Sequence, residues 1–373
     1  MSIPFVDIKT QFRHLEGDIR RRLDRVFEHC RFIMGPEIEE LEAELCRFVG
    51  VRHTVSCASG TDALLIPLMA LGIGPGDAVF TTPFTFVATA EVITLAGATP
   101  VYVDIDPRTF NMDPNLLESA VQRVKNEGRL KPRAVIPVDL FGLPADYDAI
   151  EAISGRHELV VLEDAAQGLG GVYKGRAAGS FGQVAGTSFF PAKPLGCYGD
   201  GGAIFTDDDD LAEAMRSIRF HGKGEDQYDN VRIGLNGRLD TMQAAILQAK
   251  LAVFPEELRA RRQVAQWYDE FLVGVETPFV PRDYQSAWAQ YSVLSDRREA
   301  IRAQLTEAGI PSAVYYAKPL HLQSAYRDGR YGPGDMPHSE AASRRIFSLP
   351  MHPYLEKAQV KLIAEVFAKI HCC

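Results

Sequence analysis

The chain has 373 residues, 46% of them hydrophobic and 24% charged, and it carries a formal net charge of −9 at pH 7. A chain of this length can bury a large core and form one large domain with a smaller one. The acidic balance and the lack of a basic block argue against a nucleic-acid partner. No stretch reaches the roughly 20 apolar residues that a bilayer requires, so we expect a cytoplasmic protein without a membrane partner.

The cysteines show no metal-ligand spacing, and no metal is expected. In a chain of this length, cysteines are more often reduced core residues than a disulfide framework. They are Cys30, Cys46, Cys57, Cys197, Cys372 and Cys373.

Helix and strand signals alternate through the first two thirds of the chain. Apolar residues at helical spacing predict a helix over residues 11–30, and Pro36 suits the first turn of the next helix. Short apolar runs predict buried strands. This rhythm argues for a mostly parallel sheet with helices on both faces, in a large domain over residues 1–254. The predicted strands are 78–82, 100–105, 134–139, 159–162 and 184–190, and the predicted helices are 11–30, 36–45, one beginning within 83–89, 114–125, 146–154, 211–220 and 241–251.

The pattern of predicted helices and strands changes at Pro255, and we expect a smaller α+β domain over residues 255–373. A long helix is predicted directly after this proline, and residues 326–337 are expected to form a loop. The other predicted elements are a strand over 291–294, an edge strand over 310–316, and helices over 256–271, 297–308 and 356–370.

Two chemically distinctive residues follow apolar runs. Asp164 comes at the carboxyl end of a predicted strand, where open α/β sheets place their ligand sites. Lys193 follows another predicted strand. Lysine is costly to bury, so a lysine amid proline, glycine and aromatic residues needs a chemical reason. One such reason is an amine that forms a Schiff base with a carbonyl cofactor.

The motifs around these two residues resemble the nucleotide-sugar aminotransferases of the DegT/StrS class, which use pyridoxal 5'-phosphate (PLP). The motifs are Glu-Asp-Ala-Ala-Gln from residue 163 and Ser-Phe-Phe-Pro-Ala-Lys-Pro-Leu-Gly-Cys-Tyr-Gly-Asp-Gly-Gly from residue 188. The similarity runs from about Pro4 to the C-terminus, and linked motifs are more specific than a single Gly-rich loop. It implies PLP as the cofactor and an aspartate-aminotransferase-like α/β fold of fold type I.

The resemblance gives each motif residue a role around PLP. Lys193 would carry the Schiff base and shuttle the proton, and Asp164 would keep the pyridine nitrogen protonated. Gln167 would lie near the ring hydroxyl, and Ser188 would donate a hydrogen bond to the phosphate. The resemblance also assigns Phe86 to stacking on the ring, whereas Phe84 is predicted to be a core residue.

A small-residue turn at residues 56–62 opens an apolar helix, whose free N–H groups suit a phosphate. From the sequence alone, a plain helix cap is the better interpretation of this turn. The resemblance assigns Gly60 and Thr61 to the PLP phosphate.

Four further residues are assigned to a partner subunit or to the substrate. On the bare sequence, Asn236 and Arg238 could simply cap and pair. In the family, this segment crosses a dimer interface, where the asparagine reaches the partner's PLP phosphate and the arginine lies beside the substrate. The resemblance therefore implies a homodimer with shared active sites. Tyr315 and Tyr316 fall where relatives have substrate-facing residues, and core packing is an equal alternative.

Relatives transfer an amino group, usually from L-glutamate, to a keto-sugar on a nucleoside diphosphate. Lys193 separates this chain from branches that have histidine there and deoxygenate sugars. Pro194, where glutamate-dependent members often have asparagine, is one of the features that resemble a particular subgroup. That subgroup aminates C3 of a UDP-2-acetamido-2-deoxy-3-oxo-hexuronic acid for surface polysaccharides such as O-antigen. We hypothesise that Arg238 binds the uronate carboxylate, because the guanidinium fork matches two oxygens.

Two alternative functions remain. One is a 3- or 4-aminotransferase that acts on a dTDP- or UDP-linked keto-deoxyhexose. The other is a non-catalytic sensor of PLP or a sugar nucleotide, against which the presence of both Lys193 and Asp164 argues.

Overall fold

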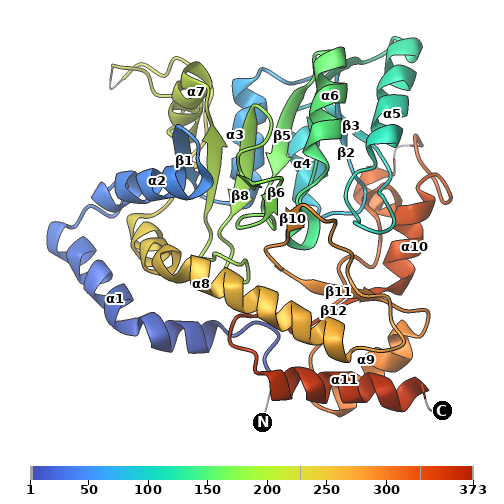
Figure 1. Cartoon of the computed structure of the whole chain (residues 1–373). Helices are drawn as coiled ribbons and strands as arrows, with labels where there is room; N and C mark the ends of the chain where they lie inside the picture. Colours follow the sequence, from blue (N-terminus) through green and yellow to red (C-terminus); the bar gives the residue numbers. More distant parts are fainter. Residues whose placement is uncertain (1–2, 227, 328, 372–373) are drawn as a thin grey trace.

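The computed structural model describes residues 3–226, 228–327 and 329–371, and its centre is a seven-stranded sheet (Figure 1). Its strands are β1 (His53–Cys57), β2 (Asp77–Thr81), β3 (Thr99–Tyr102), β4 (Lys131–Ile136), β5 (Val160–Asp164), β8 (Val184–Ser188) and β9 (Gly202–Thr206). They lie in the order β1-β9-β8-β5-β4-β2-β3. From β8 to β3 all neighbours are parallel, whereas β9 is antiparallel to both β8 and β1. The predicted mostly parallel sheet is therefore confirmed.

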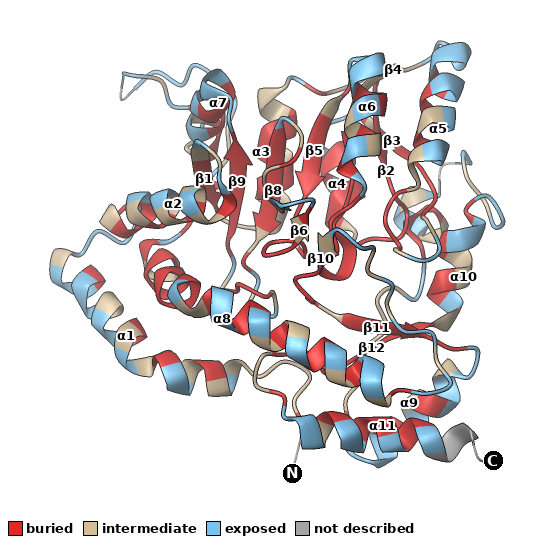
Figure 2. Cartoon of the chain, viewed as in Figure 1, coloured by how far each residue is buried: buried red, intermediate tan, exposed pale blue. Residues whose placement is uncertain are grey.

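Helices cover both faces of this sheet. Successive residues of a strand point to opposite faces. On β2, Val79 packs into one hydrophobic core, and Ala78 and Phe80 pack into another. The strands are buried almost throughout (Figure 2). The helices of this part are α1 (Ile8–His29), α2 (Pro36–Val49), α3 (Gly60–Ala70), α4 (Ala88–Leu95), α5 (Pro114–Glu127), α6 (Tyr147–His157) and α7 (Asp209–Arg219), with a 3-10 turn η1 at Leu140–Gly142.

One prediction about the helices is wrong. Two helices were expected on either side of Pro255, but a single helix, α8 (Thr241–Phe271), runs through this proline. Buried Phe254 and Leu258 on the inner side of the helix anchor both flanks of Pro255 in one core, so packing outweighs the lost backbone hydrogen bond. Helix α8 then reaches a second core, to which Val264 and Tyr268 belong. The division of the chain near residue 254 remains a proposal.

The second core is built around a short antiparallel pair, β11 (Tyr291–Leu294) and β12 (Ile346–Leu349). Strand β11 was predicted with these bounds, whereas β12 and helix α10 were missed. The expected edge strand at 310–316 is wrong, because only Ala313 forms a bridge, to Ser348. The remaining elements are α9 (Arg298–Glu307), α10 (Pro337–Arg345), α11 (Lys357–His371), β6 (Val172–Tyr173), β7 (Arg176–Ala177), β10 (Tyr284–Gln285), and the 3-10 turns η2 (Leu320–Leu322) and η3 (Ser324–Tyr326).

The four cysteines in the described part of the chain, Cys30, Cys46, Cys57 and Cys197, are free thiols. Cys372 and Cys373 lie outside the described residues. None of the described helices combines the length and the apolar character needed to span a membrane.

Replacing Pro255 with alanine should stabilise the protein. Pro255 is exposed, so little packing is lost, and alanine restores the N–H that can donate to the carbonyl of Leu251. We expect the free energy of unfolding to rise by about 1–3 kcal/mol in a denaturant titration. A fall would show that the proline ring itself contributes to packing.

Candidate active site

The predicted catalytic acid lies at the carboxyl end of the central sheet. Asp164 is the last residue of β5 and is paired with Gly186 of the parallel strand β8. Its side chain is only slightly exposed. One carboxylate oxygen accepts a hydrogen bond from Thr89 Oγ1 at 2.8 Å, and the other accepts one from the Ala166 N–H at 3.1 Å. Burial raises the pKa of Asp164, and these two donors together with the nearby Lys193 charge oppose the rise.

Lys193 lies in the turn that follows β8, two residues before buried Leu195. Its backbone N–H donates to the carbonyl of Phe190 at 2.8 Å, which closes the turn. Burial lowers the pKa of the Lys193 amine to about 8, and the charge of Asp164 opposes this shift. The structure therefore brings the two predicted catalytic residues together as an electrostatically interacting pair. An amine with such a pKa is substantially neutral at mildly alkaline pH and can act as a nucleophile or a base.

The predicted phosphate turn meets the end of β8. Ser59 caps α3 by accepting a hydrogen bond from the Asp62 N–H at 3.0 Å. A Cβ atom placed on Gly60 would lie 2.6 Å from Cβ of Ser188, so only glycine permits this approach. The first turn of α3 and the Ser188 hydroxyl therefore lie on either side of the same small region. The helix start supplies unpaired N–H groups and the positive end of its dipole. Gly60, Thr61 and Ser188 are therefore arranged as a phosphate cradle would require.

The predicted ring-stacking residue lies near the acid. Phe86 is 55% exposed, whereas Phe84 is fully buried, as expected for a core residue. The carbonyl of Phe86 accepts a hydrogen bond from the Thr89 N–H at 3.3 Å, and the Thr89 hydroxyl donates to Asp164. The uncovered phenyl ring is thus close enough in the fold to cover a flat ligand beside Asp164.

Gln167 is oriented by two hydrogen bonds. Its Oε1 accepts from the Phe141 N–H at 2.8 Å, and its Nε2 donates to the Tyr316 hydroxyl at 3.1 Å. The Tyr316 ring also packs edge-to-face on Phe84, with 6.1 Å between the ring centroids. Tyr316 therefore reaches the site from the C-terminal part of the chain. Tyr315 is half-buried and packs against Tyr316, with 5.8 Å between the ring centroids.

Asn236 and Arg238 lie on the segment that leads into α8. Arg238 Nη2 donates to Asn236 Oδ1, and the guanidinium lies 4.6 Å from the centroid of the Phe220 ring. Arg238 Nε has no hydrogen-bond partner among the described residues. The carbonyl of Gly237, between them, accepts from the Ala58 N–H at 3.0 Å, so the segment abuts the strand end that precedes α3.

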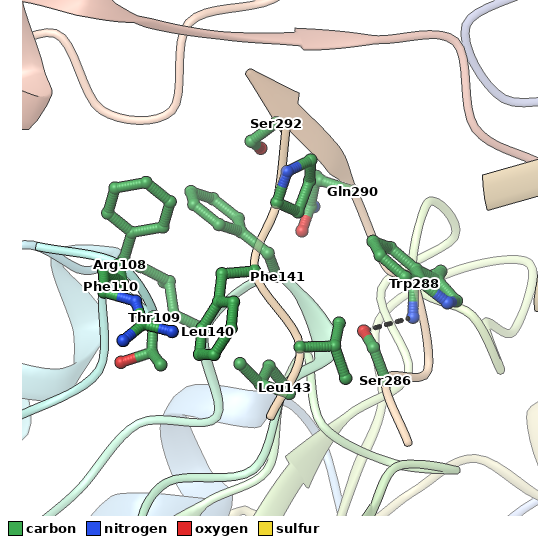
Figure 3. Close-up of a pocket in the computed structure, with 13 residues that line it drawn as sticks. Arg108, Thr109, Phe110, Leu140, Phe141, Leu143, Ser286, Trp288, Gln290 and Ser292 are labelled. Carbon is green, nitrogen blue, oxygen red and sulfur yellow. Dashed lines mark hydrogen bonds between the residues drawn. The ribbon is translucent and has the colours of Figure 1, made fainter. Parts of the chain in front are cut away.

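A cavity beside the turn η1 is lined mainly by aromatic and aliphatic side chains, including Phe110, Phe141 and Trp288 (Figure 3). Its free volume is about 20 Å³, which is enough for about one water molecule. It is too small for a cofactor.

Sequence reasoning missed Thr89 as a site residue. The motif search followed the strand ends and the glycine turns, whereas Thr89 belongs to the first turn of α4 and reaches Asp164 from another element. A threonine shortly after the predicted stacking residue Phe86 was the only available signal.

Thr89→Val tests whether this hydroxyl supports the site. Valine keeps the branched shape but removes the donor, so the pKa of Asp164 should rise further and its carboxylate should be less available to a cationic ring. We expect PLP to bind the cofactor-free protein about tenfold more weakly in an absorbance titration. The matched control is Thr81→Val, because the Thr81 hydroxyl donates to the Ile136 carbonyl rather than to Asp164. Equal PLP affinities for the two variants would contradict this role.

Comparisons with known proteins agree with this arrangement. Residues 14–368 match the model of the DegT/DnrJ/EryC1/StrS aminotransferase family. UDP-2-acetamido-2-deoxy-3-oxo-D-glucuronate aminotransferase of Pseudomonas aeruginosa is 50% identical over 363 residues, which cover 97% of this chain and 98% of that protein. A crystal structure of a DegT DnrJ EryC1 StrS aminotransferase from Brucella abortus is 52% identical, with a TM-score of 0.97 over 99% of both chains.

The crystal structure of NtdA from Bacillus subtilis, with bound cofactor PMP, has a TM-score of 0.86 and 29% identity. It covers 96% of this chain and 82% of that one. The predicted family, fold and cofactor are thus confirmed. The chain belongs to the DegT/DnrJ/EryC1/StrS aminotransferase family and is a PLP-dependent sugar aminotransferase of fold type I.

Proposed function

We propose that this enzyme transfers the amino group of L-glutamate to C3 of a UDP-2-acetamido-2-deoxy-3-oxo-hexuronic acid, for a surface polysaccharide such as O-antigen. The supporting observation is the 50% identity, over nearly the whole chain, to the aminotransferase for UDP-2-acetamido-2-deoxy-3-oxo-D-glucuronate. The contrast with a dTDP-linked keto-deoxyhexose is chemical, because a uronate brings a carboxylate that a deoxyhexose lacks.

The site residues have the following roles in this proposal. PLP, when bound, supplies an electron sink for the C–H bond that breaks beside the nitrogen. Asp164 holds the proton on the ring nitrogen, and Gln167 orients the ring hydroxyl. Lys193 is the residue that would hold the cofactor covalently, and its Nζ, when free, would take and return the proton. The lowered pKa of Lys193 supports this role, because a base must be neutral to accept a proton.

Arg238 is the proposed partner of the uronate carboxylate. Its guanidinium is half-buried over the Phe220 ring and keeps one N–H without a partner among the described residues. A buried unpaired donor is costly, and a carboxylate would satisfy it with a charge-assisted bond. Tyr315 and Tyr316 are proposed to contact the sugar from the other side of the site.

Arg238→Lys and Arg238→Ala should discriminate between substrates. With L-glutamate as donor, both variants should raise the KM for the UDP-linked 3-keto-uronate by about tenfold or more. The KM for the corresponding neutral 3-keto-sugar should change much less, because no carboxylate is lost. Equal effects on the two substrates would remove the carboxylate assignment, and activity on a dTDP-4-keto-6-deoxyhexose alone would favour the alternative function.

We also propose a homodimer with shared active sites, in which Asn236 and Arg238 complete the partner's site. Large apolar side chains, each at least 42% exposed, gather in segments next to this one. They are Phe27, Phe32, Ile33 and Ile233, of which Phe27 packs on Phe32 and Ile33 forms a bridge to Asp240. The Thr241 N–H donates to the Phe32 carbonyl, which joins two of these segments. Exposed patches of this kind mark association surfaces.

Mixing two defective variants tests the shared sites. Lys193→Ala and Arg238→Ala proteins, each nearly inactive alone at low substrate concentration, should regain about a quarter of the wild-type activity when dissociated and reassembled together. Each mixed dimer then contains one intact site and one doubly defective site. If both residues serve the same chain, every site keeps one defect and no activity returns. Lys193→Ala mixed with Asp164→Ala is the control without recovery.

A cytoplasmic location completes the proposal. Four free thiols among the described residues are compatible with a reducing compartment.

A further inference from the structure

Two buried carboxyl groups lie beneath the PLP site and have no role in the proposed chemistry. Asp139 follows β4, and Glu163 precedes Asp164 on β5; both side chains are fully buried. Val138 pairs in parallel with Asp164, so the side chains of Asp139 and Glu163 leave the same face of the sheet, where the two carboxyl groups interact. Two anions cannot both remain charged at contact in a buried place, because each loses its hydration and repels the other.

The hydrogen bonds indicate how this conflict is resolved. Both oxygens of Glu163 accept backbone N–H groups, from Gly179 at 2.6 Å and from Phe181 at 2.8 Å. Asp139 Oδ1 accepts the Ala145 N–H at 3.0 Å and the Tyr147 hydroxyl at 2.7 Å. These three oxygens are occupied as acceptors, which favours negative charge on them.

The fourth oxygen is different. Asp139 Oδ2 is buried without a donor among the described residues. Gly168 closes over it, since a Cβ atom on this glycine would lie 2.4 Å from Oδ2. An oxygen with no donor and no access to water is the natural place for a proton, which can then point at Glu163.

The backbone connects this pair to the cofactor residues. The Asp139 N–H donates to the carbonyl of Asp164 at 3.1 Å, and the Asp139 carbonyl accepts from Gly142 at 3.3 Å, within the turn η1. The same turn presents the Phe141 N–H that fixes Gln167. Hydrogen bonds therefore link the backbone of Asp139 to both residues that are assigned to the cofactor ring.

We propose that Asp139 and Glu163 are positioning residues that share one proton, carried on Asp139 Oδ2, and that this shared proton holds Asp164 and Gln167 in place for PLP. The proposal rests on the assignment of Asp164 and Gln167 to the cofactor but not on the identity of the sugar. Tyr147 from α6 and Asp164 from β5 are the other titratable groups that face the pair among the described residues.

The pH dependence of stability has a definite sign. Burial raises the pKa values of both Asp139 and Glu163. The folded protein therefore binds the shared proton more tightly than the unfolded chain, and stability falls as the pH rises from about 4 towards the folded-state pKa. Asp139→Asn removes this loss, because its amide carries a permanent N–H where the carboxyl carried a proton.

The test compares variants by melting of the cofactor-free protein between pH 5 and 9 and by PLP titration. Asp139→Asn should melt at a higher temperature than wild type at pH 8, with the difference shrinking towards pH 5, and should bind PLP within about twofold of wild type. Glu163→Gln turns an N–H donor towards Gly179 or Phe181, so its PLP affinity should fall about tenfold. Asp104→Asn is the control, because that buried carboxylate accepts the N–H groups of His338 and Ser339 and should lose stability throughout the range.

Several results would overturn the proposal. One is an Asp139→Asn protein that fails to fold or that parallels the wild-type pH profile. Another is a Glu163→Gln protein with wild-type stability and PLP affinity together with an Asp139→Asn protein that has lost both. That result would place the proton on Glu163. If Glu163→Gln does not fold, the Asp139→Asn profile decides alone. Altered pH profiles with unchanged PLP affinity in both variants would separate the pair from Asp164 and thus remove its positioning role.

Discussion

The buried carboxylate of Asp164, facing the amine of Lys193 at the carboxyl end of the parallel strands, is the interaction on which the site depends. Burial acts on the two groups in opposite directions: it raises the pKa of the acid and lowers that of the amine, and their mutual attraction opposes both shifts. The Thr89 hydroxyl donates to Asp164 and opposes the rise in its pKa. The result is an amine that loses its proton at mildly alkaline pH beside an acid whose charge is supported by hydrogen bonds, as amine-transfer chemistry requires.

Close backbone contact is the second constraint. Helix α3 reaches the ends of β8 and β9 only because Gly60 packs on Ser188 and Gly202 packs on the Ser59 carbonyl, where a Cβ atom would lie 2.3 Å away. This contact brings the N–H groups of a helix start to the strand end that precedes Lys193. A phosphate held there would fix one end of the cofactor, and Asp164, as proposed, would hold the ring nitrogen at the other.

The parts of the fold and site that could be predicted are those with local signals. Apolar runs predicted β5 and β8, and Asp164 at the end of β5 and Lys193 in the turn after β8 were predicted as the catalytic pair. Pro255 shows where such signals fail: its lack of an N–H argued for a helix end, but cores on both sides of it kept α8 continuous. Thr89, Tyr316 and the Asp139–Glu163 pair depend on contacts between elements far apart in sequence, which no local pattern records.

The exposure of the site in one chain supports the view that other groups complete it. Proton transfer at Lys193 benefits from a dry surrounding, because exclusion of water strengthens electrostatic interactions. Yet Phe86, which is assigned to the cofactor ring, and Phe190, whose carbonyl accepts the Lys193 N–H, are each more than half exposed. Cofactor and substrate can cover Phe86, whereas the exposed Phe190 ring at the start of the Lys193 turn has no assigned cover. In the proposed homodimer, a second copy of the chain packed over Phe190 would exclude water from the turn that contains Lys193. The same association would bring the second copy's Arg238 to the substrate.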